Sequence, residues 1–225
     1  MVNRKLNNIF LSASIPIKER HPKYFDTADV IAIRDAVISL TTTVLDKHRL
    51  IWGGHPSITP LIYNVMEKMT LLKLREQPDW NFLSKDLQDK KLESELKSEI
   101  QRHVHLYQSE FFKDVFPPDN KNFENITFTE KIGDVHSSIQ QMRKRLFSEN
   151  KFSAAVFIGG MDGIEVEYNM FSEYHPKALI LPIASTGGAT KIVYDSIFPE
   201  ELKNIRLERD FGYKSLLQKF LIDKI

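Results

Sequence analysis

Two glycine-rich turns in the chain combine residue types that suit the binding of an anionic group. They are Gly53-Gly54-His55 and Gly159-Gly160-Met161-Asp162-Gly163. Each follows a short apolar run and precedes a helical pattern, so each is expected where a strand turns into a helix. Glycine permits a sharp turn and leaves the backbone amides, together with the next helix N-terminus, open to a phosphate. Three glycines within five residues favour a binding role for the second turn over a purely structural one.

Ionisable and hydroxyl side chains stand beside both turns. Glu167 lies four residues after Gly163, where its carboxylate is suited to ribose hydroxyls or to acid–base chemistry; away from the glycines it would be read as a solvated charge. His55 has two evenly weighted interpretations: it contacts phosphate or carries a proton near neutral pH, or it only holds the turn. Ser57 and Thr59 either add hydroxyls to the site or cap the next helix.

Polar side chains also follow the other expected strands. Ser12, Ser14 and Arg20 offer two hydroxyls and a guanidinium for phosphate or carboxylate, although solvation explains Arg20 at least as well. Gln108 is suited to a base edge or a ribose, and a hydrogen bond within its loop explains it equally. A last loop either completes a wall of the site or merely turns the chain, and position slightly favours binding: Ser185, Thr186 and Gly187.

Several classes of chemistry are disfavoured by what the chain lacks. His103 and His105 are expected to alternate along one strand, with no carboxylate at a diagnostic spacing, so we expect no metal site. There is no cysteine, and the P-loop lysine motif, the Gly-x-Ser-x-Gly elbow and the Gly-x-Gly-x-x-Gly fingerprint are absent. The sequence therefore disfavours a nucleoside triphosphatase, an α/β-hydrolase and a nicotinamide dehydrogenase, and predicts no bound cofactor.

Alternating strand and helix patterns must position these side chains. Helices are expected from Asp26 through the apolar stripe ending at Val44, from Ser57 or Thr59, and from Asp134, with further ones near Ile192 and at 213–221. This alternation predicts an α/β, Rossmann-like fold, a mainly parallel sheet with helices on both faces, in one domain spanning 1–225. Ligands bind such sheets at the carboxyl ends of the strands. The strands are expected at 8–14, 49–52, 104–107, 125–128, 154–158 and 178–183.

Composition sets the remaining bounds. Lys and Arg total 31 against 30 acidic residues, a formal net charge of +1, so a long nucleic acid is not the expected partner. No stretch approaches the roughly 20 apolar residues that span a bilayer, and the absence of cysteine suits a reducing compartment. We therefore expect a cytoplasmic protein that does not bind a membrane. Residues of about 70–100 are rich in charge and predict a solvated helical excursion.

The chemistry-bearing segments together resemble the SLOG superfamily, named for its Smf/DprA and LOG members, and within it the third prokaryotic cluster. The segments are Leu11–Pro16 with Arg20, Gly53–Leu61, Gln108-Ser109, and Ile158–Ile164 with Glu167. The resemblance covers most of the chain and implies a Rossmann-like fold with a pocket for a nucleotide-type ligand. It also implies self-association as a homodimer or larger assembly.

LOG enzymes carry the motif Pro-Gly-Gly-x-Gly-Thr-x-x-Glu and release a base from cytokinin nucleotides. Here Ile158 replaces the proline, one extra residue precedes Gly163, and Ile164 replaces the threonine, while Glu167 keeps its spacing from Ile164. Other SLOG domains, joined to sirtuin or TIR modules in anti-phage defence, recognise cyclic nucleotide signals derived from NAD. The altered motif therefore favours binding without hydrolysis.

Two functions follow from the resemblance. The first is a sensor of an ADP-ribose-like or cyclic nucleotide in prokaryotic anti-phage defence or stress signalling, acting through self-association or a separate effector protein. The second is an enzyme that cleaves an N-glycosidic bond, a phosphoribohydrolase or a deoxyribosyltransferase-like enzyme, with Glu167 as its catalytic residue.

Overall fold

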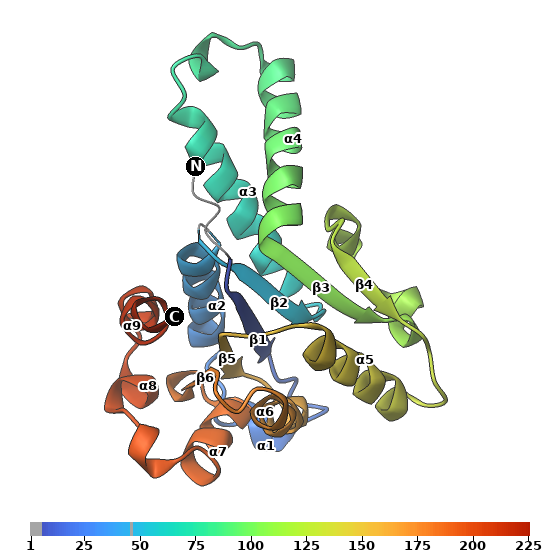
Figure 1. Ribbon diagram of the computed structural model, residues 1–225, viewed down its shortest axis with the longest axis vertical. Helices are drawn as coiled ribbons and strands as arrows, with labels where there is room; N and C mark the ends of the chain where they lie inside the picture. Colours follow the sequence, from blue (N-terminus) through green and yellow to red (C-terminus); the bar gives the residue numbers. More distant parts are fainter. Residues whose placement is uncertain (1–5, 46) are drawn as a thin grey trace.

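Six short apolar segments form one parallel sheet in the computed structural model, which describes residues 6–45 and 47–225 (Figure 1). Every strand pair is parallel, and all six residues of β5 are buried, as expected for a strand covered on both faces. The predicted α/β, Rossmann-like fold is confirmed. The strands are β1 (Asn8–Ser14), β2 (Arg49–Gly53), β3 (Val104–Ser109), β4 (Ile126–Thr129), β5 (Ala154–Gly159) and β6 (Leu179–Ile183).

The strand order places a topological switch point at the centre of the sheet. The order is β4-β3-β2-β1-β5-β6, so the chain builds outward from β1 to β4 and then returns to the other side of β1. The loops that leave β1 and β5 therefore diverge, which is the topological switch point where open α/β sheets bind ligands. The register pairs Ser12 with Phe157 and Ser14 with Gly159. Both serines thus stand beside this switch point.

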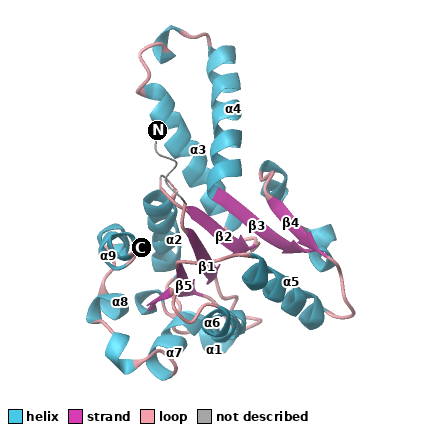
Figure 2. Cartoon of the chain, viewed as in Figure 1, coloured by secondary structure: helices cyan, strands magenta, loops and turns pink. Residues whose placement is uncertain are grey.

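Helices cover both faces of the sheet (Figures 1 and 2). On one face α2 contacts β1, β2 and β5, and α9 packs against α2; on the other face α5 contacts β3 and β4, and α6 contacts β1 and β5. The helices are α1 (Pro22–Phe25), α2 (Val30–Val44), α3 (Thr59–Arg75), α4 (Lys85–His103), α5 (Val135–Glu149), α6 (Asp162–Tyr174), α7 (Gly188–Ser196), α8 (Ile205–Arg209) and α9 (Tyr213–Phe220). None of these helices is long and apolar enough to cross a membrane in the described part of the chain.

The start of α2 differs from the prediction. Asp29, not Asp26, caps the helix, because its carboxylate accepts a hydrogen bond from the Ala32 amide at 2.9 Å. Asp26 ends the separate helical turn α1, which Pro22 starts. The prediction started this helix at Asp26, in place of Asp29, because Asp26 also precedes the apolar stripe of α2. Asp29 is the residue in extended conformation that a cap requires.

An aromatic cluster fixes α5 and α6 against β1. Phe10 packs edge-on against Phe147 of α5 at 4.9 Å between ring centroids and stacks on Phe171 of α6 at 5.8 Å. Alternate strand residues share a face, so Ser12 and Ser14 point to the same side of the sheet as Phe10. The cluster therefore positions α5 and α6 relative to these two hydroxyls.

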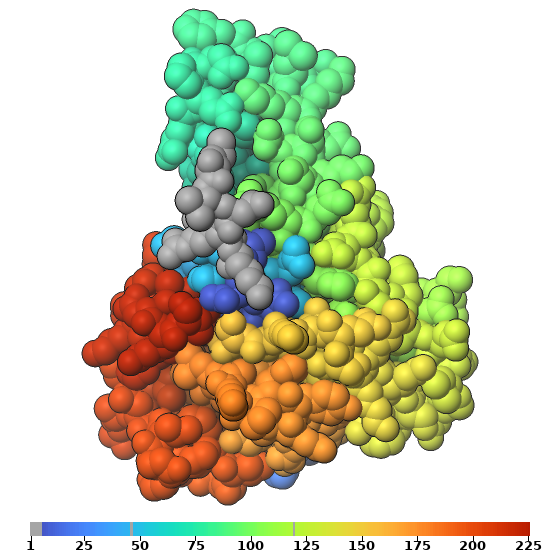
Figure 3. Space-filling view, in the orientation of Figure 1, coloured from blue at the N-terminus to red at the C-terminus, as the bar shows by residue number. Residues whose placement is uncertain are grey.

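The charged segment of about 70–100 forms a helical arm that projects from the sheet (Figures 1 and 3). The end of α3, a 3₁₀ turn at Trp80–Phe82 and the long α4 make up this arm. Its surface carries ion pairs such as Lys85–Asp89 and Lys90–Asp86. His103 is the last residue of α4 and its Nδ1 lies 2.8 Å from the His48 carbonyl oxygen. The expectation that His103 and His105 share one strand is therefore wrong, because β3 begins only at Val104.

The arm tip allows a first prediction. Phe82 is 88% exposed, whereas Trp80 two residues earlier is 5% exposed. Phe82→Ser should change the free energy of unfolding by less than about 0.5 kcal/mol, since exposed side chains contribute little to stability. Trp80→Ser is the matched control and should cost more than about 1 kcal/mol because it empties a buried site. Urea denaturation would measure both, and equal losses would contradict this description of the tip.

Candidate functional site

The carboxylate of Glu167 lies at the centre of a polar network beside the switch point of the sheet. The Ser12 hydroxyl donates a hydrogen bond to its Oε2, and Arg143 Nε donates to its Oε1 at 2.9 Å. The three side chains come from β1, α5 and α6. Both oxygens of the carboxylate are thus oriented by the protein, on the face of the sheet that α5 and α6 cover.

Arg143 is a site residue that the sequence analysis missed. Its side chain is only 13% exposed, and its Nη2 lies 3.5 Å from the Gly163 carbonyl oxygen. A Cβ on Gly163 would lie 2.8 Å from the same nitrogen, so the absence of a side chain at Gly163 makes room for the guanidinium. One signal was available: Arg143 stands four residues after Ile139 and three before Leu146, inside the apolar stripe of α5, where a charge needs a partner.

The glycine loop after β5 depends on backbone conformations that favour glycine. Gly159 and Gly160 have φ of 59° and 79°. The Gly159 amide donates to Thr186 Oγ1 and the Gly160 amide donates to the Ser14 carbonyl oxygen, each at 2.8 Å. These two amides are therefore bonded within the protein. The conformation brings the loop against the end of β1.

The loop after β6 packs against the glycine loop and is hydrogen-bonded to it. Thr186 Oγ1 also donates to the Ile183 carbonyl oxygen at 2.6 Å, and the Ala189 amide donates to the Gly160 carbonyl oxygen at 3.0 Å. Gly187 has φ of 70°, and a side chain there would collide with the Thr27 carbonyl oxygen. Ser185 instead donates to the Asp210 carbonyl oxygen and faces Tyr213 of α9. The structure thus places Ser185 apart from the Glu167 network.

The first turn of α6 combines free amides with negative charge. Met161 stands at the N-cap without a side-chain cap, and the first amides of any helix, here at Asp162 and Gly163, have no acceptor within the helix. Asp162 and Glu165 are the acidic residues of this turn. Tyr24 of α1 donates to Glu165 Oε1 at 2.8 Å. Burial and this neighbouring carboxylate raise the pKa of Tyr24 to about 12, so it remains a donor at neutral pH.

The turn after β2 holds His55 in one orientation. The Ser57 amide donates to His55 Nδ1 at 3.3 Å, and Ser57 Oγ lies 2.8 Å from the same nitrogen. Thr59 is fully buried, and its hydroxyl oxygen accepts from Trp52 Nε1 at 3.2 Å and from the His55 amide at 3.3 Å. Burial lowers the pKa of His55 to about 4, and the positive charge of Arg20 lowers it further in the same direction. His55 is therefore neutral at pH 7.

Gln108 lies farther along the sheet edge, at the end of β3. Its side chain occupies the space that a Cβ on Gly54 would need, and Asn120 Nδ2 donates to its Oε1 at 3.4 Å. Both Gln108 and Asn120 are 5% exposed. Gly53, by contrast, adjoins α5, where a Cβ would lie 3.0 Å from Met142 Cε. Because Gly53 and Gly54 have no side chains, Met142 and Gln108 can pack against the two sides of this turn.

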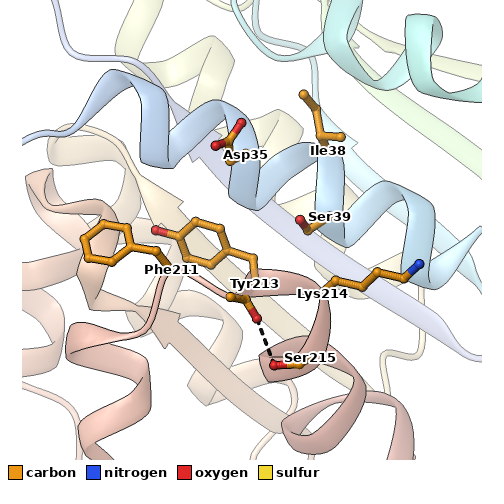
Figure 4. A pocket seen from close by; sticks show the side chains of 8 residues that line it. Asp35, Ile38, Ser39, Phe211, Tyr213, Lys214 and Ser215 are labelled. Carbon is orange, nitrogen blue, oxygen red and sulfur yellow. Dashed lines mark hydrogen bonds between the residues drawn. The ribbon is translucent and has the colours of Figure 1, made fainter.

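Two hollows in the surface lie away from the strand ends. One, of about 450 Å³, lies between the outer side of α2 and the start of α9. Its lining includes Asp35, Ile38, Phe211 and Tyr213 (Figure 4). The other, of about 340 Å³, lies between α3, α4 and the segment 121–124. Among the side chains that the structure describes, no three of His, Asp or Glu are grouped so as to hold a metal ion.

The Arg143–Glu167 pair gives a second prediction. Its side chains are 13% and 18% exposed, so a double-mutant cycle with Arg143→Met and Glu167→Gln should give a coupling energy of about 1–2 kcal/mol. The control is Arg145–Glu149, an ion pair on α5 that is 45% and 42% exposed. The same substitutions there should give roughly 0.5 kcal/mol or less. Chemical denaturation of the two cycles makes the comparison, and a weaker coupling for Arg143–Glu167 would contradict the geometry.

Comparison with known proteins identifies the family. No curated protein matches the chain. A family model described as the SLOG cluster3 family matches residues 23–76 and 90–221, which include the turn after β2, Arg143 and the whole of the glycine loop and α6. Residues 1–22, which carry Ser12, Ser14 and Arg20, lie outside the match, as do 77–89, which form the arm tip and the start of α4, and 222–225. Because the match covers most of the chain, the resemblance noted from the motifs is confirmed, and the chain belongs to the SLOG cluster3 family.

Proposed function

We propose that this protein is a sensor that binds a nucleotide-derived signal, ADP-ribose-like or cyclic, in the crevice between β1 and β5. The observation that carries the proposal is the Glu167 carboxylate, oriented by Ser12 and Arg143 at the switch point of the sheet. A carboxylate fixed in this way suits the two vicinal hydroxyls of a ribose. Membership of a nucleotide-related Rossmann-like family supports the same ligand class.

The arrangement favours capture over turnover. Both oxygens of Glu167 already accept hydrogen bonds, and the loop between Gly160 and Glu167 departs from the hydrolase motif at Ile164. We place the protein in prokaryotic anti-phage defence or stress signalling, with output through self-association or a separate effector.

One observation favours a second candidate, an enzyme that cleaves an N-glycosidic bond. A carboxylate next to the sugar can stabilise the oxocarbenium-like transition state of glycoside cleavage. Glu167 is the only acidic side chain in its network with Ser12 and Arg143 among the described residues. In this case Glu167 would be the catalytic residue, and base release would accompany binding.

A panel of nucleotides separates the two candidates. The purified chain is incubated with AMP, NAD, ADP-ribose and cyclic ADP-ribose isomers, and thermal unfolding and product chromatography are followed together. A ligand at a hundred times its Kd raises the free energy of unfolding by about 2.7 kcal/mol. Stabilisation by an intact ligand supports the sensor, base release that Glu167→Gln abolishes supports the enzyme, and no stabilisation by any nucleotide overturns both.

A further inference from the structure

The backbone donors expected to hold a phosphate are largely occupied. The amides of Gly159 and Gly160 bond to Thr186 and Ser14, and the Ala189 amide, in the first turn of α7, bonds to the Gly160 carbonyl oxygen. Helix α7 therefore directs its N-terminus at the glycine loop itself. A phosphate at this loop would have to displace bonds that hold the loop together.

The N-terminus of α6 is also a poor place for an anion. Asp162 and Glu165 stand in its first turn, where negative side chains already complement the helix dipole. A phosphate there would add negative charge to a turn that already carries two acidic residues. The glycine loop and α6 therefore leave the phosphate of the proposed ligand without an obvious partner.

Unused donors gather instead where β1 and β2 end. The register pairs Leu11 with Trp52, and β2 ends at Gly53, so Ser14 at the end of β1 and His55 in the turn after β2 lie at the same edge of two neighbouring strands. Among the described side chains, the Ser14 hydroxyl has no hydrogen-bond partner and Arg20 has no ion-pair partner. The positive charge of Arg20, on the loop that follows β1, acts on His55. The end of β1, the loop that follows it and the turn after β2 thus carry a hydroxyl, a cation and an imidazole at the same edge of the sheet.

The tautomer of His55 turns its outer nitrogen into a donor. A backbone amide can only donate, so the bond from the Ser57 amide makes His55 Nδ1 an acceptor. The proton of the neutral ring therefore sits on Nε2. Together with the guanidinium of Arg20 and the hydroxyl of Ser14, this N–H can hydrogen-bond to the oxygens of an anion.

We propose that Ser14, Arg20 and His55 form an anion subsite that takes the phosphate or diphosphate group of the ligand, while Glu167 takes its ribose. The assignment of this anion to a nucleotide rests on the proposed function. A strand rises about 3.3 Å per residue, which sets Ser14 about 6.6 Å beyond Ser12. At this spacing one nucleotide can reach both the carboxylate beside Ser12 and the hydroxyl of Ser14. The ligand is therefore a phosphorylated nucleoside, and an unphosphorylated nucleoside binds more weakly.

The subsite is tested with inorganic pyrophosphate, which needs no nucleoside. The ring signal of His55, assigned with His55→Asn, is followed by NMR during a pyrophosphate titration at constant ionic strength. The signal should move saturably in the wild type. Arg20→Gln should weaken this binding at least tenfold, whereas Lys18→Gln, an exposed charge in the same loop, should change it less than twofold. An unmoved His55 signal, or equal effects of the two variants, would overturn the proposal.

The same variants separate this subsite from the proposed function. If pyrophosphate binds as described and no nucleotide does, the subsite stands and the sensor proposal fails. If a nucleotide stabilises the protein and Arg20→Gln binds it as tightly as Lys18→Gln does, the sensor proposal stands and the subsite is wrong. Because Arg20 is exposed, its substitution is expected to leave the fold intact.

Discussion

Replacing Gly187 with alanine should lower the free energy of unfolding by more than about 3 kcal/mol. Gly187 adopts φ of 70° and ψ of −153°, a region that is essentially restricted to glycine. An added Cβ would also collide with the Thr27 carbonyl oxygen and lie 2.9 Å from Ala28 Cα, and these backbone atoms cannot rotate away. Strain and collision add together, which makes this a severe substitution. Urea denaturation followed by circular dichroism would measure it.

Gly133 provides the matched control for Gly187. It also has positive φ, 54°, but no heavy atom lies within 4 Å of the position where its Cβ would stand. Gly133→Ala should therefore cost only the left-handed backbone conformation, about 1 kcal/mol. Equal losses at the two positions would show that the loop after β6 does not pack on the segment before α2 as described.

The stability of the protein should fall in acid through His55. The unfolded chain binds a proton at His55 near pH 6.5, whereas the folded protein keeps the ring neutral until about pH 4. The folded-state pKa is lowered, so the stabilisation is fully present above pH 6.5, decreases as the pH falls towards 4, and is lost below it. The two pKa values correspond to about 3 kcal/mol. Denaturation between pH 4 and 8 would record this loss.

A His55→Asn variant isolates this contribution, because burial also lowers the pKa of His105 and His175 and adds to the slope in acid. Asparagine keeps an acceptor for the Ser57 amide but does not titrate. The wild-type and variant profiles should run parallel above about pH 7.5 and diverge below pH 6.5. Profiles that stay parallel down to pH 4 would mean that His55 is not held neutral by burial.

The sequence predicted the fold well because the signals for it are local. Six apolar runs each end at a turn or at a polar segment, and the continuous apolar stretch Ala154–Ile158 is typical of a strand buried on both faces of a parallel sheet. Both bounds of β4 and the first residue of β6 lie one residue later in the structure than predicted. The helix stripe of α2 was read correctly, while its start was not. Caps depend on the conformation of one residue, and Asp26 and Asp29 are equally good caps by type.

The site was predicted less completely because its chemistry depends on contacts between distant elements. Glu167 and Ser12 were identified from their motifs, but Arg143 joins them from 24 residues before Glu167 on another helix. The glycines of the loop after β5 were expected to expose their amides. Only the folded structure shows that Thr186 and Ser14 accept hydrogen bonds from these amides. Local sequence indicated which strand ends carry polar side chains, and tertiary packing decides which of their hydrogen-bond donors are free.

The central claim is that a nucleotide-type ligand binds at Glu167. It is tested most directly by titration calorimetry of the nucleotide that gives the largest thermal stabilisation, with wild type, Glu167→Ala and the control Glu173→Ala, an exposed residue of the same helix. We predict that Glu167→Ala raises the Kd at least tenfold and that Glu173→Ala leaves it within twofold of the wild-type value. Equal Kd values for the wild type and Glu167→Ala would contradict the account.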